Sequence, residues 1–316
     1  MNRFTKILLC LLALLMAGFA VTRCGQRTRP NGPDRLNAPH SAYSASAPPP
    51  PAVVPPRPQL STKNNEPGTP QRVTLNDQPL ANIPQLSVTR ARSFTNSLGV
   101  KFVPVPGSNI LMSIWETRVQ DYASYAAANS GVDDAWKDAE FIGIKQGPDH
   151  PVVNVSWEDA RLFCQWLSKK EGKIYRLPAD HEWSLAAGIG NREDPRASPF
   201  SKDREIKDVF PWGTQWPPPR YAGNYGSIPS ILDEHRFTSP VGSYAPGKLG
   251  IYDLGGNAYE WCEDEYSSSS RVLRGASWLN FKPDDLLSSR RSLNDPSGRD
   301  ILNGFRVVVV VGAGGG

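Results

Sequence analysis

One stretch of this chain cannot build a hydrophobic core. Between Ala20 and Ser93 the only aromatic residue is Tyr43, whereas all nine Trp lie between Trp115 and Trp278. A segment with so few large apolar side chains cannot bury enough surface to offset the entropy lost on ordering it. The 316 residues therefore divide into a long non-globular part and a domain over residues 93–311, which is long enough to bury a substantial core.

The first 23 residues are typical of an export signal. Arg3 and Lys6 precede a continuous apolar run from Ile7 to Val21, which is shorter than the about 20 residues that a membrane-spanning helix needs. We expect a signal peptide cleaved after Ala20 or, as alternatives, an uncleaved anchor or a lipidated Cys24. The protein is thus predicted to be extracytoplasmic, whether periplasmic, secreted or associated with the bacterial envelope membrane through its N-terminus.

Residues 24–92 are predicted to be a disordered, proline-rich tether. Between Gln26 and Arg92 lie 14 of the 30 prolines, including Pro48 to Pro51, and this composition favours extended, solvated chain. A proline-rich ligand for a partner's groove is the alternative interpretation. The last five residues, 312–316, form a Gly-rich tail.

The charge distribution excludes one class of protein. Residues up to Arg92 carry 11 Lys+Arg against 3 Asp+Glu, and the remainder carries 24 against 28. The basic excess therefore belongs to the tether, while the domain is mildly acidic and has scattered Lys and Arg. This is not the pattern of a basic nucleic-acid-binding domain. Four Cys are also too few for a disulfide-built scaffold of this length.

Secondary-structure signals are clear in only a few places. A capping-box pattern at Thr117 opens a predicted helix through about Ala128, and a second at Ser156 opens a helix that ends at Gly172. Residues 178–187 indicate a short third helix, and residues 272–275 and 305–311 indicate strands. Residues 190–250 are rich in Pro, Gly, Asn and Trp without a sustained period. Few helices, short strands and a long ordered loop region predict an α+β domain.

Six segments together resemble one known family, the sulfatase-modifying factors, whose founding member is the formylglycine-generating enzyme. The segments lie at residues 153–160, 175–183, 210–213, 250–261, 274–278 and 303–306, with sequences VNVSWEDA, YRLPADHEW, FPWG, GIYDLGGNAYEW, RGASW and NGFR. The resemblance implies a single C-type-lectin-like domain with little regular secondary structure. It also implies bound calcium ions and a surface groove for an extended peptide.

The family's calcium ligands can be placed on this sequence residue by residue. One ion would be held by Asn224, the Tyr225 carbonyl, Asp233 and the His235 carbonyl. The second would be held by Asp253, the carbonyls of Gly256 and Ala258, and Glu260. Such mixtures of carboxylate and carbonyl oxygens suit calcium, although Asp253 and Glu260 could also simply cap local turns.

The family's copper site does not carry over in the same way. In the founding enzyme two Cys thiolates that follow the Gly-x-Ser motif hold copper. Here Asn280 stands at the first thiolate position and Asp285 falls near the second, while Ser277 matches the family's oxygen-site serine. Hard oxygen ligands cannot replace soft thiolates for Cu(I), so we expect no copper. Whether the chain is an enzyme is left open.

The other candidate chemistry is sparse. Cys164, at helical spacing with Trp157, and Cys262 are expected to be separate, mostly buried thiols, with a disulfide between them as the alternative. The four His, at 40, 150, 181 and 235, are far apart in sequence and indicate no iron site. Core packing is favoured for Trp212, Trp216 and Trp261, and a structural role for Arg306.

The sequence therefore predicts an exported, calcium-stabilised domain without copper oxidase activity. Ser277, Trp278 and Arg291 correspond to family positions at or under the groove, and a peptide or glycan is the expected ligand. One alternative is an active formylglycine-generating oxidase that matures sulfatases. Another is a structural envelope protein.

Overall fold

The computed structural model describes residues 92–228, 230 and 234–311. The predicted signal or anchor (1–23), almost all of the tether (24–92) and the tail (312–316) lie outside the described residues. Within the part that is described, no helix is both long enough and apolar enough to cross a membrane.

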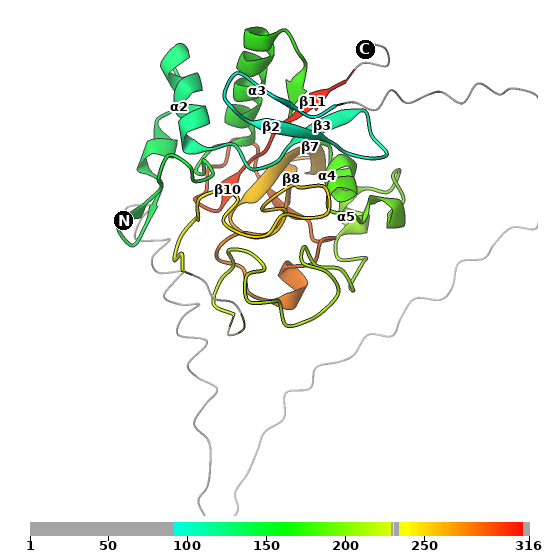
Figure 1. Cartoon of the computed structure of the whole chain (residues 1–316). Helices are drawn as coiled ribbons and strands as arrows, with labels where there is room; N and C mark the ends of the chain where they lie inside the picture. Colours follow the sequence, from blue (N-terminus) through cyan, green and yellow to red (C-terminus); the bar gives the residue numbers. More distant parts are fainter. Residues whose placement is uncertain (1–91, 229, 231–233, 312–316) are drawn as a thin grey trace, which may run out of the picture. The chain divides into compact units, whose positions relative to one another are not determined.

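A five-stranded antiparallel sheet joins the two ends of the domain. Its order is β1 (Phe94–Thr95), β2 (Lys101–Pro104), β3 (Ile110–Ser113), β11 (Val308–Val310) and β6 (Tyr175–Arg176). Strand β11, from the end of the domain, pairs with β3 on one side and β6 on the other. All four residues of β3 are buried, and the first three, Ile110 to Met112, are apolar, so the strand is covered on both faces and shows no alternation. Figure 1 shows β2, β3 and β11 side by side.

A second sheet of four strands has the order β10 (Asn303–Gly304), β7 (Tyr259–Ser267), β8 (Ser270–Arg274) and β9 (Ser292–Asn294). Strand β10 runs parallel to β7, and the other pairs are antiparallel. A separate hairpin joins β4 (Glu140–Phe141) to β5 (Ile144–Lys145). The predicted strand at 272–275 is confirmed as the end of β8, and β11 occupies part of the predicted strand at 305–311.

The helices are α2 (Val119–Ala128), α3 (Trp157–Glu171), α4 (Asp180–Ala186) and the short α5 (Pro199–Lys202). Three 3₁₀ turns, η1 (Ala135–Asp138), η2 (Gly190–Arg192) and η3 (Pro283–Asp285), complete the regular elements. Ser156 caps α3 by accepting a hydrogen bond from the Asp159 N–H, and Gly172 ends it with φ of 64°. The predicted limits of α3 are thus confirmed, because both ends are fixed by local sequence.

The start of α2 differs from its prediction by one residue. Arg118, not Thr117, is the N-cap, and its N–H donates to Asp121 Oδ2 at 3.0 Å. The Thr117 N–H donates instead to the Phe305 carbonyl at 2.8 Å. A tertiary backbone contact therefore fixes Thr117 before the helix begins.

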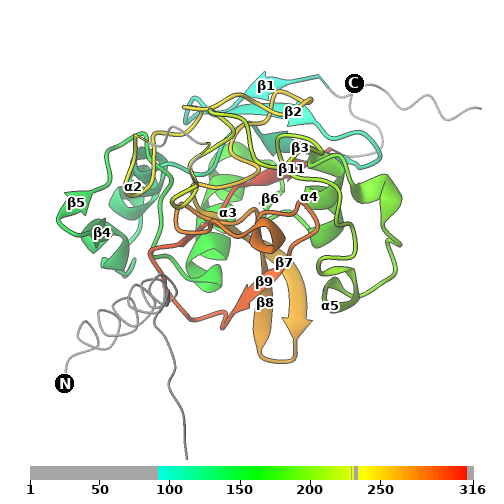
Figure 2. The same ribbon diagram turned by 90° about the horizontal axis from the view of Figure 1, so that it is seen from below.

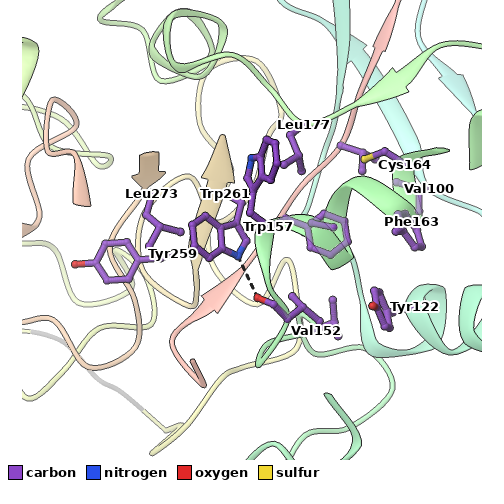
Figure 3. Close-up of a cluster of buried hydrophobic side chains, with 14 of the residues drawn as sticks. Val100, Tyr122, Val152, Trp157, Phe163, Cys164, Leu177, Tyr259, Trp261 and Leu273 are labelled. Carbon is purple, nitrogen blue, oxygen red and sulfur yellow. Dashed lines mark hydrogen bonds between the residues drawn. The ribbon is translucent and has the colours of Figure 1, made fainter. Parts of the chain in front are cut away.

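The core lies between α3 and the two sheets. Figure 3 shows Trp157, Phe163, Tyr122 and Trp261 converging there. Trp261 is fully buried, as predicted. Between α5 and β7 the described chain contains no helix or strand, which confirms the part of the predicted loop region 190–250 that follows α5, while η2 and α5 lie in its first part. In Figure 2 this connection runs as an irregular trace over the domain.

Candidate functional site

The segment Asp253–Glu260 bends sharply just before and into β7. Asp253, Gly256 and Asn257 have φ of 54°, 80° and 61°. A Cβ on Gly256 would lie 2.3 Å from the Asn224 carbonyl oxygen, so only glycine fits this backbone contact. The Asn257 N–H donates to the same carbonyl at 2.8 Å. The bend therefore joins the two predicted calcium segments, around residues 224 and 253–260.

Glu260 is bound on both oxygens by side chains of the chain itself. Arg306 Nη2 donates to Oε1 and Nε donates to Oε2, each at 2.6 Å. Trp183 Nε1 also donates to Oε2, at 2.8 Å. Glu260 and Arg306 are both completely buried. The structural role predicted for Arg306 is thus confirmed, because it neutralises a carboxylate that water cannot reach.

A second buried carboxylate, Glu116, clamps the same bend. It lies between β3 and α2, and its Oε1 accepts from the Ala258 N–H at 3.1 Å while Oε2 accepts from Asn257 Nδ2 at 2.7 Å. The sequence analysis did not single it out. The only signal is an acidic residue directly after the apolar Ile114-Trp115 pair and before a helix.

Three buried carboxylates around this bend, Glu116, Asp253 and Glu260, interact electrostatically with one guanidinium, that of Arg306. Burial, followed by the nearby charges of Asp253 and Glu260, raises the pKa of Glu116 well above its ordinary value. Burial likewise raises the pKa of Asp253 to about 6, although the Gly242 N–H, which donates to Oδ2 at 2.7 Å, opposes that shift. Desolvation thus dominates the electrostatics here.

The second predicted calcium site does not fit this arrangement. An ion between Asp253 and Glu260 would have to share the Glu260 oxygens with the Arg306 guanidinium, whose positive charge would repel it. The described part of the chain also contains no group of three or more His, Cys, Asp or Glu arranged to hold a metal. Asp253, Gly256, Ala258 and Glu260 are held together by Arg306 and Glu116.

The first predicted site has a feature that a cation would satisfy. Asn224 is fully buried, and its Nδ2 donates to the Phe237 carbonyl at 2.9 Å, whereas its Oδ1 has no hydrogen-bond partner among the residues that the structure describes. An unpartnered buried acceptor is costly. Tyr225 is buried beside it and His235 is half-buried. Asp233 lies outside the described residues. The donor chemistry at Asn224 fits calcium.

In the segment that follows β8, the side chains at the two thiolate positions already have partners within this chain. Asn280, at the first thiolate position, accepts from both the N–H and the hydroxyl of Ser277, at 2.9 and 2.8 Å. Asp285 lies 3.2 Å from Arg204 Nη2 and 3.7 Å from Arg290 Nε. Arg290 in turn pairs with Asp203 at 3.0 Å. The two residues at the thiolate positions therefore take part in polar contacts within the chain.

The three predicted groove residues lie beneath the surface. Ser277 is fully buried and Trp278 is 5% exposed, with Nε1 donating to the Ile301 carbonyl at 3.3 Å. The Trp278 ring packs against Phe141, at 4.7 Å between centroids. In this arrangement neither side chain presents a binding surface to solvent.

Arg291 is buried in an ion-pair network and does not line a groove. It contacts Asp180 at 3.0 Å and Glu193 at 2.7 Å. The network also includes Lys202, 2.7 Å from Asp180, and Arg274. These five side chains are all at most 3% exposed. The structure places Arg291 beneath the surface, because its partners Asp180 and Glu193 come from segments far away in sequence and enclose it.

Cys164 and Cys262 are free and fully buried, as predicted. Burial raises the pKa of both thiols. Cys164 packs in the cluster around Trp157, and Cys262 belongs to a second cluster around Trp183. A raised pKa disfavours the thiolate form that copper binding requires.

Exposed aromatic and apolar side chains gather on the loops near these elements. Phe210 and Trp212 stack at 5.0 Å with Trp216 beside them, at 5.6 Å from Phe210. Trp212, predicted to pack in the core, is half-buried and packs against the core cluster. Trp216 is 42% exposed, so the core prediction for Trp216 was wrong. It forms the outer layer of the stack. Tyr221, Leu279 and Phe281 are exposed as well.

A backbone hydrogen bond joins the loop that contains Trp216 and Tyr221 to the loop that contains Leu279 and Phe281. The Gly226 N–H donates to the Asn280 carbonyl at 2.8 Å, and a Cβ on Gly226 would lie 2.5 Å from the Leu279 carbonyl oxygen. The loop around Trp216 is thus connected through Tyr225 and Gly226 to the loop around Leu279. The sequence signal for this surface is the group of four aromatic residues within twelve positions of a Pro- and Gly-rich loop, at 210, 212, 216 and 221.

The domain is C-type-lectin-like and of the formylglycine-generating-enzyme type. It has short strands, one capped central helix, long ordered loops, and a buried Arg–Glu pair whose members lie in the NGFR and GNAYEW motifs. The chain matches the model of the sulfatase-modifying factor enzyme 1-like domain over residues 53–311. It therefore belongs to this family. The match begins within the predicted tether.

Known relatives include both inactive and active enzymes by name. The chain is 35% identical over 145 residues to the inactive C-alpha-formylglycine-generating enzyme 2 of Bos taurus, covering 44% of this chain and 42% of that one. It is 35% identical over 201 residues to the formylglycine-generating enzyme of Thermomonospora curvata, covering 54% and 60%. The aligned regions thus span less than two thirds of either relative.

A solved structure shows the same fold. The structure of PvdO from Pseudomonas aeruginosa matches with a TM-score of 0.50 and 23% identity, covering 70% of this chain and 98% of that chain. The α+β, C-type-lectin-like fold expected from the sequence is therefore confirmed.

Proposed function

We propose that this protein is an exported, tethered binding module that uses the formylglycine-generating-enzyme scaffold without its copper oxidase chemistry. The observation that carries the proposal is the state of the two thiolate positions. Asn280 is bound to Ser277, and Asp285 is paired with Arg204. Neither supplies a soft ligand, and both are already engaged within the chain.

The remaining thiols offer no substitute within the domain. Cys164 and Cys262 are buried in separate apolar clusters, so a two-thiolate site would require both to leave the core. The similarity to a relative named as inactive agrees with this proposal, while the similarity to an active enzyme makes the oxidase the alternative to be tested.

An extended peptide is the proposed ligand, and a glycan is the other class to be compared. Support comes from the exposed aromatic side chains of Trp216 and Tyr221, with the half-buried Trp212 next to Trp216, and from the exposed Leu279 and Phe281 on the loop that Gly226 contacts. Aromatic side chains supply much of the binding energy at interfaces because they bury a large area with few rotatable bonds. Residues 1–23 support delivery of this surface outside the cytoplasm, and the tether would hold it away from the membrane.

Calcium is proposed as a structural ion at Asn224, with the Tyr225 and His235 carbonyls and Asp233 as the other ligands. The unpartnered buried Oδ1 of Asn224 supports this assignment. The ion would tie the loop of residues 224–237 to the bend at Asn257. It would act on stability and would not take part in a reaction.

A direct assay separates the module from the oxidase. The full chain is incubated with copper, oxygen and a Cys-x-Pro-x-Arg peptide, beside an authentic formylglycine-generating enzyme, and the peptide is read by mass spectrometry. We expect an unchanged peptide from this chain and aldehyde from the control enzyme. Aldehyde formed by this chain would refute the proposal.

Binding is tested separately with arrays of extended peptides and of glycans. We expect retention on peptides that is lost in Trp216→Ala, with Leu162→Ala, an exposed apolar residue on α3, as the matched control. Retention on glycans alone would show that the ligand is a glycan and not a peptide. No retention on either would favour a structural envelope protein.

A further inference from the structure

The β4–β5 hairpin carries an energetically unfavourable residue at its tip. Its two central residues, Ile142 and Gly143, have φ of 46° and 80°, which a two-residue turn of this kind requires. Asn-Gly or Asp-Gly normally fills such turns, because a β-branched side chain is strained at positive φ. Ile142 is nevertheless 67% exposed, so burial in this chain does not offset the strain.

The strand residue that precedes the turn is anchored. The Phe141 ring packs on Trp278 at 4.7 Å and on Phe237 at 6.4 Å between centroids. Ile144 pairs directly with Phe141 in the strand register and is 40% exposed. Figure 2 shows β4 and β5 at the periphery of the domain. The anchored Phe141 is thus next to two exposed isoleucines, Ile142 and Ile144, which we call the isoleucine tip.

The sequence segment that carries the isoleucine tip is acidic. Residues 131–149 contain two Lys and five acidic residues, all five exposed: Asp133, Asp134, Asp138, Glu140 and Asp149. The lysines face acidic partners within the segment, Lys137 with Asp134 and Lys145 with Glu140. Arg299 and Arg118 lie 3.7 and 3.8 Å from Asp133 and Asp149. The segment on either side of the tip therefore carries more negative than positive charge of its own at exposed positions.

We propose that the isoleucine tip docks an extended peptide that places an apolar side chain against Ile142 and Ile144 and flanking Lys or Arg side chains near the acidic residues. Ile142 is strained in this turn, and no burial within the domain offsets the strain. Such a residue indicates a role in binding another molecule. Charge complementarity selects the basic partner and rejects an acidic one. This inference rests on the proposed peptide-binding function, adds the isoleucine tip as a second contact surface for the peptide, and specifies the peptide class.

The test uses the full chain and three labelled peptides in fluorescence anisotropy. The first alternates Lys and Leu, the second replaces Lys by Glu, and the third replaces Leu by Ser. We expect binding of the first alone, weakened by added salt because exposed charges are screened. Ile142→Asn should weaken it about tenfold or more and yet raise the melting temperature by a few degrees, since Asn suits the turn.

Two further variants keep the test decisive. Ile144→Thr should also weaken binding, and it leaves the turn itself unaltered. Leu162→Asn changes an equally exposed apolar residue on α3 and should leave the affinity unchanged. Binding of the Lys-Leu peptide that survives both isoleucine substitutions would overturn the docking site and leave the proposed function standing.

The remaining outcomes separate the two proposals. If the Lys-Leu peptide is not bound while other peptides in the array are, the basic class is wrong and the peptide-binding function stands. If the chain retains no peptide at all, both proposals fail. If the Glu-Leu peptide binds as tightly as the Lys-Leu peptide, charge does not select the ligand and the inference is overturned.

Discussion

Arg306 and Glu260 form a bidentate ion pair in which both N···O distances are 2.6 Å and neither side chain is exposed. The pair joins the segment before β11 to β7, across 46 residues of sequence. Charged hydrogen bonds of this kind are short and directional. They fix the bend at residues 253–260 from the inside of the domain.

Breaking this pair should destabilise the fold strongly. In Glu260→Gln the shape of the side chain is kept, but the Arg306 charge is left buried without a counter-charge. We expect the free energy of unfolding to fall by about 3–5 kcal/mol, measured by urea denaturation with Trp fluorescence. The exposed pair of Arg192 and Asp208 supplies the control, since Arg192→Gln should leave the midpoint unchanged. Equal midpoints for wild type and Glu260→Gln would contradict the role given to the pair.

Stability in acid should depend on Asp180. Two arginines, Arg274 and Arg291, together with Lys202, hold the pKa of Asp180 well below its ordinary value of 3.8, against the opposing effect of burial. The unfolded chain therefore binds this proton more readily, and stability is present above pH 3.8 and lost as the pH falls below it toward the folded-state pKa.

The comparison with Asp180→Asn isolates this effect. The variant should be less stable than wild type at pH 7, and the difference between their free energies of unfolding should shrink as the pH falls below about 4. Urea titrations across that range give the difference directly. A gap that widens on acidification would show that the sign of the pKa shift is wrong.

Local sequence predicted the elements whose ends are fixed by neighbouring residues. Helix α3 has its cap at Ser156 and its stop at Gly172, and both were identifiable without the rest of the chain. The burial of Trp261 and the role of Arg306 followed from motifs that recur in the family. The calcium site at Asn224 stays a prediction, and the buried Oδ1 that has no partner among the described residues supports it.

Contacts between distant segments could not be predicted in this way. Glu116 reaches Ala258 across 142 residues, and nothing near Glu116 in sequence indicates that partner. Arg291 is buried because Asp180 and Glu193 surround it, more than ninety residues away. Trp216 was placed in the core because its residue type favours burial, whereas stacking on Phe210 leaves it in the outer layer. These outcomes depend on tertiary geometry.

Calcium removal should lower stability through Asn224. An ion that binds only the native state stabilises it by mass action, so chelation should reduce the melting temperature and added calcium should restore it. Asn224→Ala should abolish this response, because it removes the side-chain oxygen proposed as a ligand. Differential scanning fluorimetry with elemental analysis of the purified protein measures both the shift and the ion.

Glu260→Gln is the matched comparison for calcium. It should be destabilised and should still respond to chelation, since Arg306 and not an ion balances Glu260. A chelation response that disappears in Glu260→Gln would restore the second calcium site. Absence of calcium by elemental analysis, together with no response in wild type, would remove the first.

The two buried thiols should be unreactive in the native protein. Burial raises the pKa of Cys164 and Cys262, so little thiolate forms at neutral pH and reagents cannot reach the sulfur. We expect the peptides containing them to remain unlabelled by iodoacetamide until urea is added, as mapped by mass spectrometry. Asp284→Cys places an exposed thiol in the segment after Ser277 and should be labelled in the native state. Rapid native labelling of Cys164 or Cys262 would mean that the core opens enough to present a thiolate. Copper titration of the unlabelled protein would then become the decisive measurement for the oxidase alternative.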